Sequence, residues 1–118
     1  MPREIQTFGD GIVKICSVEN VAERGNAPKD KLSEAYTLRY KERTVGVTRY
    51  WTAMQNNIKV DTVIRCHRVR DVTTGHVAVL QEGKQYAIKQ IQYPEGILPP
   101  VMDLSLERIE KRYEFVGD

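Results

Sequence analysis

The sequence predicts an all-β fold: a small six-stranded antiparallel barrel or sandwich with one long loop between its first strands. Three observations support this. Short segments are rich in Val, Ile, Thr and Tyr, glycine-containing turns separate them, and long helical patterns are scarce. Closing the sheet on itself hides edges that would otherwise pair with other chains. A chain of 118 residues has the size of one domain, which we place at residues 1–118.

The first predicted strands flank a long polar segment. Ile12 to Val18 and Thr44 to Met54 carry apolar residues in alternation. Between them, Glu19 to Arg43 contains Gly25, Pro28 and eleven charged side chains. Such a segment buries little apolar surface, so we expect residues 19–43 to form a long loop that is mobile in the isolated subunit. The prediction allows a short strand or a turn of helix near residues 34–40.

The middle of the chain predicts a meander of three antiparallel strands. Asp61 to Val69 alternates as a half-exposed strand, with Cys66 on one face and Arg65 on the other. Glycine turns then lead into His76 to Leu80 and Lys84 to Tyr93. The apolar phase shifts near residues 89–90, which predicts a β-bulge.

The C-terminal segment fits two structures. Met102, Leu104 and Leu106 alternate as in a strand, whereas Leu106, Ile109 and Tyr113 also fit one face of a helix. Alternation over the whole chain predicts a core lined by Val47, Trp51, Ile64, Cys66, Val79, Ile88 and Leu104.

Residues with catalytic or metal-binding chemistry do not cluster. Cys16 and Cys66 lie 50 positions apart and are expected to be buried. His67 and His76 lie on neighbouring predicted strands, but no acidic residue or cysteine is spaced to complete a metal shell. We therefore expect no catalytic residue, no metal and no cofactor. Met1 to Asp10 lacks the basic start and apolar stretch of a signal peptide, which predicts a protein used in a cytoplasm.

Charge is unevenly distributed, although the net charge is only +2. Residues 59–70 carry four basic side chains against one acid, and residues 103–118 carry five acids against three bases. This asymmetry suits contacts between copies of the chain or with an acidic partner, and a plain solvated surface explains it equally well.

Four segments resemble, in order and spacing, the head-closure (head-tail joining) proteins of tailed bacteriophages. They are RTVGVTRYWTAM (Arg43 to Met54), KVDTVIRCHR (Lys59 to Arg68), HVAVLQEGKQYAIKQIQ (His76 to Gln92) and PPVMDLSLERIE (Pro99 to Glu110). The opening DGIVKI (Asp10 to Ile15) fits more weakly.

The resemblance implies a structural virion protein of the head-tail connector that performs no catalysis. Its copies would form a ring, twelve-fold in the virion, below the portal and its adaptor. That ring would close the head, extend the channel for packaged double-stranded DNA and offer the tail an attachment surface. Assembly would take place in the cytoplasm of the bacterial host.

The resemblance also implies a loop that projects into the channel and helps retain DNA. We assign this role to residues 19–43, with the cations Arg24, Lys29, Lys31, Arg39, Lys41 and Arg43. The uneven charge assigns the subunit interface to Arg65, Arg68, Arg70, Glu107 and Glu110.

The alternative function is an oligonucleotide-binding β-barrel, in which Tyr50, Trp51 and Tyr86 would stack on bases. The low net charge and the scattered aromatic residues argue against a continuous single-strand groove.

Overall fold

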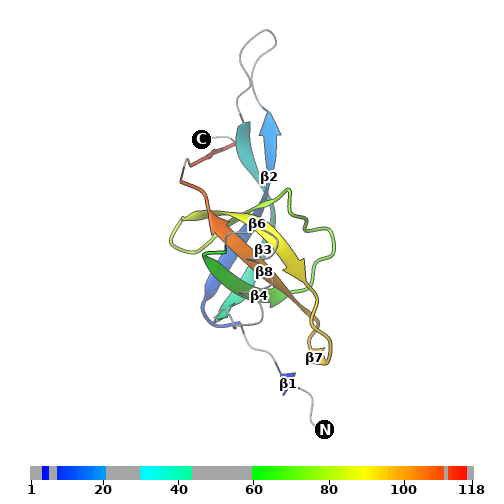
Figure 1. Cartoon of the computed structure of the whole chain (residues 1–118). Coiled ribbons are helices and arrows are strands. Elements are labelled where there is room, and N and C mark those ends of the chain that lie inside the picture. The colour runs from blue at the N-terminus through cyan, green and yellow to red at the C-terminus, as the bar shows by residue number, and fades with distance from the viewer. Residues whose placement is uncertain (1–3, 6–7, 21–29, 44–59, 111, 117–118) are drawn as a thin grey trace.

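Six strands form a closed hydrogen-bonded ring in the computed structural model (Figure 1). The structure describes residues 4–5, 8–20, 30–43, 60–110 and 112–116. The ring strands are β2 (Gly11–Asn20), β3 (Asp30–Arg43), β4 (Thr62–His67), β5 (Val77–Val79), β6 (Gln85–Gln92) and β8 (Val101–Arg108). They follow the order β2-β5-β6-β8-β4-β3, and β3 pairs back to β2.

All neighbouring pairs in the ring are antiparallel, which confirms the predicted all-β fold class. The ring is not a regular barrel, because β5 is only three residues long and the ladders shift register in two places. Three short strands lie outside it: β1 (Glu4–Ile5), β7 (Ile97–Leu98) and β9 (Glu114–Phe115). β1 pairs parallel with β7, and β9 pairs parallel with β3.

The expected long loop is mostly strand. β2 continues to Asn20, and β3 pairs with it from Asp30 through Tyr40, so the loop prediction is wrong for residues 19–20, 30–33 and 41–43, and the short strand allowed near residues 34–40 is part of a longer one. Tyr40 is buried in the main core, and Leu32 is buried in a second cluster on the other side of the register shift in the β2–β3 ladder. A buried face of a strand needs only every second residue to be apolar. The charged residues of β3 can therefore occupy the remaining positions of a regular strand. Residues 21–29 lie outside the described part of the chain.

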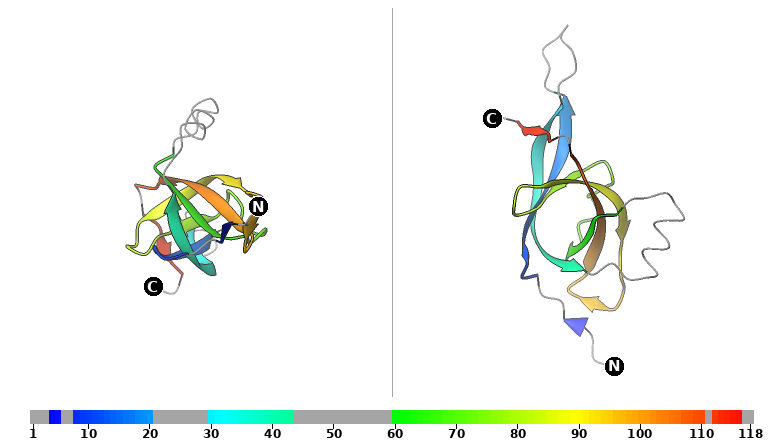
Figure 2. Two further views of the ribbon diagram at one scale, coloured as in Figure 1. Left: turned by 90° about the horizontal axis from the view of Figure 1, so that it is seen from below. Right: turned by 60° about the vertical axis from the view of Figure 1, so that its left-hand side comes forward.

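The β2–β3 hairpin extends beyond the ring (Figures 1 and 2). β2 pairs with β5 only at residues 14–16, whereas its pairing with β3 runs on to Asn20. β9 adds a short third strand beside β3 at Lys31 and Leu32. The projecting part is therefore a small sheet attached to one side of the ring.

The predicted meander is correct in its second half only. β5 and β6 pair around a tight turn that places Gly83 at a φ of +87°, a backbone conformation that favours glycine. β4 pairs instead with β3 and β8, because residues 68–76 carry the chain across to β2. The predicted bulge is confirmed between Ile88 and Gln90.

The ring encloses the main core, which receives side chains from all six strands. The predicted core residues Ile64, Cys66, Ile88 and Leu104 belong to this cluster and are buried. Val79 is also buried, but in a second cluster with Cys16, Leu32 and Val77. Val47, Trp51 and the predicted strand 44–54 lie outside the described residues.

The C-terminal segment is a strand through Arg108 and then folds over the second cluster. Ile109, Tyr113 and Phe115 pack against that cluster from outside. The side-chain amide of Gln85 fixes this arrangement, since it donates to the Tyr113 carbonyl and accepts from the Tyr113 N–H, both at 2.8 Å. The described residues contain no helix.

Candidate interaction surfaces

Three basic side chains of the expected loop form a row on the outer face of β3. Arg39, Lys41 and Arg43 are exposed and occupy alternate positions, so they project from the same face at intervals of about 6.6 Å. We call these three residues the basic row. Lys31 lies further along the strand, with its ammonium 3.9 Å from the Glu114 carboxylate. Arg24 and Lys29 lie outside the described residues.

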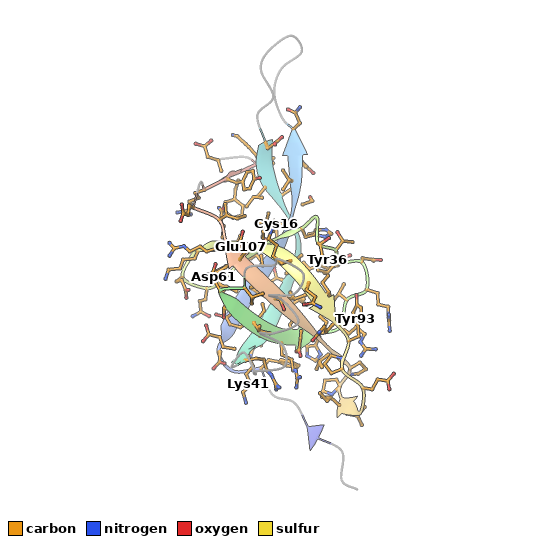
Figure 3. The ribbon with its side chains drawn as sticks, viewed as in Figure 1. Cys16, Tyr36, Lys41, Asp61, Tyr93 and Glu107 are labelled. Atoms are coloured by element: carbon orange, nitrogen blue, oxygen red, sulfur yellow. The ribbon has the colours of Figure 1, made fainter. Side chains whose placement is uncertain are left out.

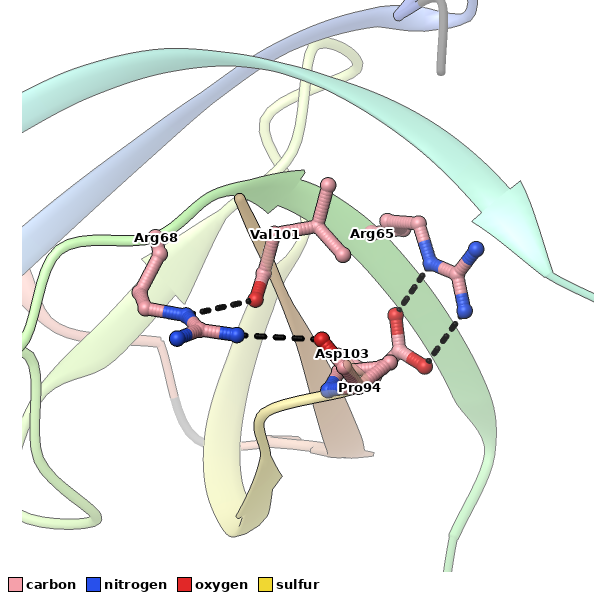
Figure 4. A network of polar contacts seen from close by, with 5 residues as sticks. All are labelled: Arg65, Arg68, Pro94, Val101 and Asp103. Atoms are coloured by element: carbon pink, nitrogen blue, oxygen red, sulfur yellow. Dashed lines mark hydrogen bonds and ion pairs between the residues drawn. The ribbon is translucent and has the colours of Figure 1, made fainter. Parts of the chain in front are cut away.

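Arg65 is buried, which corrects the expectation of an exposed basic face on β4. It lies opposite Asp103 in the β4–β8 ladder, and its guanidinium donates to both carboxylate oxygens, at 2.7 and 3.0 Å (Figure 4). The exposed fractions are 4% for Arg65 and 1% for Asp103. Because these hydrogen bonds lie inside the subunit, the Arg65 guanidinium does not offer a surface charge to a neighbouring copy.

The face of β4 and β8 that carries this ion pair is itself covered. Val63, Val101 and Ser105 share it and are buried, and the Ser105 hydroxyl has no hydrogen-bond partner among the described residues. Both faces of these central strands are therefore buried over residues 63–66 and 101–106. The half-exposed strand predicted for residues 61–69 assumed one wet face, so it is wrong for β4.

Arg68 and Arg70 lie over the same aromatic ring. Their guanidinium carbons are 5.2 and 4.7 Å from the ring centroid of Tyr93. Arg68 also donates to the carbonyls of Val101 and Pro94, at 3.1 and 3.0 Å (Figure 4). No carboxylate of the described residues forms a salt bridge with either guanidinium. We call these two side chains the arginine pair, and Arg70 is its exposed member.

The two acids predicted at the interface do not meet the arginine pair within the subunit. Glu107 is half-buried and lies 3.9 Å from the ammonium of Lys89, and Glu110 is exposed. Glu107 pairs with Ala87 at the start of β6, whereas Tyr93 follows the other end of this strand. The interface residues thus belong to separate regions.

A group of acids that the sequence did not single out acts electrostatically on Tyr40 or Tyr86. It consists of four exposed carboxylates, which we call the acidic rim: Asp10, Glu42, Asp61 and Glu82. Burial raises the pKa of Tyr86, and Glu82, Asp61 and Glu42 raise it further, against the opposing effect of Arg108. The pKa of Tyr40 is raised by burial and then by Glu82, Glu42 and Asp10, while a hydrogen bond to the Gln81 backbone lowers it.

Backbone contacts hold two members of the acidic rim in place. Asp10 accepts a hydrogen bond from the Glu42 N–H, and Asp61 accepts one from the Arg108 N–H, both at 2.7 Å. The four acids come from four separate segments of the chain. No local sequence signal could have grouped them, because only the ring topology brings them together.

The histidines and cysteines are engaged in structural contacts. The His67 ring packs against Phe8 at a centroid distance of 4.4 Å, and Nδ1 of His76 accepts from the Thr73 N–H at 3.0 Å. Burial raises the pKa of the Cys16 thiol to about 11 and that of the Cys66 thiol to about 12, which opposes thiolate formation. Within the described ranges, no three His, Cys, Asp or Glu residues are grouped to hold a metal ion.

One of the three aromatic residues that the alternative function would use for base stacking is enclosed in the core. Tyr86 belongs to the enclosed core and is 8% exposed, and Tyr50 and Trp51 lie outside the described residues. Over the described stretches, no helix is long and apolar enough to cross a membrane.

The chain was compared with protein-family models and with curated proteins. No protein-family model matches the chain, and no curated protein matches it at significant similarity.

Proposed function

We propose that this protein is a structural subunit of a bacteriophage head-tail connector. Its copies form a ring below the portal and its adaptor, close the DNA-filled head and provide the surface to which the tail attaches. The proposal starts from the sequence resemblance to head-closure proteins, and it assigns the chain no catalytic role, metal or cofactor.

One structural observation supports the proposal most directly. The resembling segments KVDTVIRCHR, HVAVLQEGKQYAIKQIQ and PPVMDLSLERIE contain β4, β5 with β6, and β8. These strands are consecutive in the ring, in the order β5-β6-β8-β4. These three segments therefore form one continuous part of the sheet, as expected if they specify a shared fold, and the fourth segment, RTVGVTRYWTAM, lies outside the described residues except for Arg43.

The basic row suits the wall of a DNA channel. Arg39, Lys41 and Arg43 present three cations per subunit on a regular strand, so a ring of copies would carry a repeated but sparse positive lining. Each phosphate neutralised by a basic side chain adds a salt-dependent contribution to DNA affinity. A sparse lining attracts DNA and still lets it slide, whereas a dense one would hold it.

Deletion of the gene in the phage or prophage that encodes it tests this function. We expect heads that package DNA but fail to retain it or to join tails, and electron microscopy of the particles would show separate heads and tails. A plasmid copy of the wild-type gene should restore tailed particles. Normal, infectious tailed particles from the deletion strain would refute the proposal.

A further inference from the structure

The C-terminal segment covers only part of an apolar strip on the outer face of the ring. Val79 follows Ala78, whose side chain belongs to the enclosed core, so Val79 projects outward from β5. Phe115 packs against the cluster that contains Val79 and Cys16, which Figure 3 labels. On the neighbouring strand β2, Ile12 alternates with core residues and stays 43% exposed. The apolar strip therefore continues beyond the cover that the C-terminal segment provides.

The uncovered part of the strip is a cavity of about 370 Å³, which we call the outer groove. It lies between the C-terminal segment and the β5–β6 turn. Among the described residues, its apolar lining comes from Ile12, Val79, Leu80 and Phe115, and its cations are Lys14 and Arg112. Ligand sites in proteins have volumes of about 300–1,000 Å³ and are mainly apolar with a few placed polar groups. The outer groove meets this description.

The polar side chains that line the outer groove are hydrogen-bond donors. Lys14 and Arg112 are exposed, and no described carboxylate forms a salt bridge with either. The side-chain oxygen of Gln81, another lining residue, accepts from the Ile12 N–H at 3.1 Å. The NH₂ group of Gln81 makes no hydrogen bond within the described part of the chain, so it can donate to a ligand.

Two acids lie near the outer groove without lining it. The carboxylate of Glu34 accepts a hydrogen bond from the Thr37 hydroxyl. Glu82, in the β5–β6 turn, acts on the pKa of two tyrosines of the enclosed core. A ligand in the outer groove therefore meets apolar surface, two cations and an amide donor, and no described carboxylate contributes to the lining.

Hydrogen bonds hold both walls of the outer groove. Gln85 fixes the C-terminal segment through its two hydrogen bonds to the backbone of Tyr113. In the turn, the Leu80 N–H donates to the Lys84 carbonyl at 3.0 Å, and the Gly83 N–H donates to the Leu80 carbonyl at 2.8 Å. The groove is thus formed before any ligand binds, as is usual for binding sites.

We infer that the outer groove binds an extended segment of a partner protein in which an apolar side chain stands next to a carboxylate. The apolar side chain covers Ile12 and Phe115, and the carboxylate binds Lys14 and Arg112. A backbone carbonyl of the segment accepts from the Gln81 amide. This inference rests on the proposed connector function and identifies a surface through which the ring engages a neighbouring protein of the particle.

The lining favours a protein segment over other ligands. A phosphate backbone has no apolar side chain to cover Ile12 and Phe115, and a DNA-binding surface needs a broader basic face. A free small molecule needs about 70–90% of its surface enclosed. Because Ile12, Lys14 and Arg112 are all exposed, the groove does not enclose a ligand to that extent. A segment of a larger partner gains further affinity from the rest of its interface.

Groove variants supplied on a plasmid to the gene-deletion strain test the site in its natural setting. Ile12→Ser removes the exposed apolar side chain, and Lys14→Glu combined with Arg112→Glu reverses both cations. Val18→Ser is the matched control for Ile12→Ser, since Val18 is an exposed apolar residue of the same strand that does not line the groove. Lys84→Glu is the control for charge, because Lys84 is exposed in the turn and also lies outside the lining.

We expect both controls to restore tailed particles as the wild-type gene does. Each groove variant should lower the yield of tailed particles at least about tenfold, because it removes apolar contact or places carboxylates opposite an acidic partner. Unfolding free energies close to that of wild type would show that the variants fold.

A capped, fluorescein-labelled hexapeptide of alternating valine and glutamate measures recognition directly. Fluorescence anisotropy should show saturable binding to the purified full chain, and binding to each groove variant should be at least about tenfold weaker. The corresponding valine–lysine peptide should bind the charge-reversed variant and not the wild type.

Three results would overturn the inference: groove variants that restore tailed particles as the controls do, a wild type that does not bind the acidic peptide, or a wild type that binds both peptides alike. Loss of double-stranded DNA affinity in the charge-reversed variant with unchanged peptide binding would identify a phosphate site instead. Failure of the connector function is distinct. A deletion strain that makes normal tailed particles would refute that function and leave the peptide titration unaffected, whereas groove variants that complement a defective deletion strain would refute the groove alone.

Discussion

The guanidinium of Arg65 and the carboxylate of Asp103 face each other across β4 and β8, joined by two hydrogen bonds in a buried layer. A buried pair of this kind is costly to break, because removal of one partner leaves an uncompensated charge without water. Arg65→Ala or Asp103→Ala should lower the free energy of unfolding by about 3–5 kcal/mol. Urea denaturation would measure this loss.

The double variant Arg65→Met with Asp103→Leu is the informative control for this pair. Apolar residues of similar volume remove both charges at once, so most of the lost stability should return. If the double variant is as unstable as the single ones, the ion pair is not the cause of the loss.

Gln85→Glu should release the C-terminal segment from the second core cluster. The substituted carboxylate can still accept from the Tyr113 N–H, but it has no N–H to donate to the Tyr113 carbonyl. We expect a loss of about 1–3 kcal/mol in unfolding free energy and faster amide exchange at Tyr113. Gln81→Glu, at an exposed position, is the matched control. Unchanged exchange at Tyr113 in Gln85→Glu would contradict the assigned role.

Stability should fall at alkaline pH partly because of Cys66. Burial and the nearby Asp103 carboxylate raise its pKa from 9.0 to about 12 in the folded protein. A raised folded-state pKa stabilises the protein fully below the unfolded value, and this contribution is lost as the pH rises from about 9 to about 12. One such thiol contributes a slope of about −1.4 kcal/mol per pH unit.

Cys66→Ala isolates this effect when the slopes, rather than the absolute stabilities, are compared. The variant should lose stability less steeply between these pH values in urea titrations. Tyr40 and Tyr86 also have raised pKa values, so some slope should remain. Identical slopes in wild type and variant would show that Cys66 ionises as easily in the fold as outside it.

The sequence correctly predicted the burial of those side chains whose position follows from alternation along a single strand. Ile64 and Cys66 are buried as expected, because the period of two fixes which face each side chain occupies. The prediction that Arg65 is exposed was wrong, because alternation along a strand does not reveal whether its second face is covered as well. The burial of Val63 on the same face as Arg65 shows that it is.

Features that depend on pairing between distant segments could not be predicted. β4 was expected beside β5, its neighbour in sequence, yet it lies between β3 and β8. The acidic rim depends on the same topology, as Asp10 and Glu82 approach only once the ring closes. The basic residues of β3 were expected on a loop, and their place on a regular strand was missed.

Single-stranded DNA titration separates the connector from an oligonucleotide-binding barrel. Of the three aromatic residues expected to stack on bases, the structure describes Tyr86 alone and places it inside the core, and the basic row supplies three cations on one face of β3. Three phosphate contacts to a single strand correspond to a slope of about −2 in log affinity against log salt concentration. We therefore expect weak binding with at most this salt dependence.

Replacing Arg39, Lys41 and Arg43 by Ala should abolish that residual binding and change the unfolding free energy by no more than about 0.5 kcal/mol each, because all three are exposed. Lys84→Ala, at an exposed turn position away from the basic row, serves as control. Fluorescence anisotropy of a labelled oligonucleotide at several salt concentrations gives both affinity and slope. Tight, saturable binding that survives the triple substitution would require a stacking groove elsewhere on the chain, and it would favour the oligonucleotide-binding barrel over the connector.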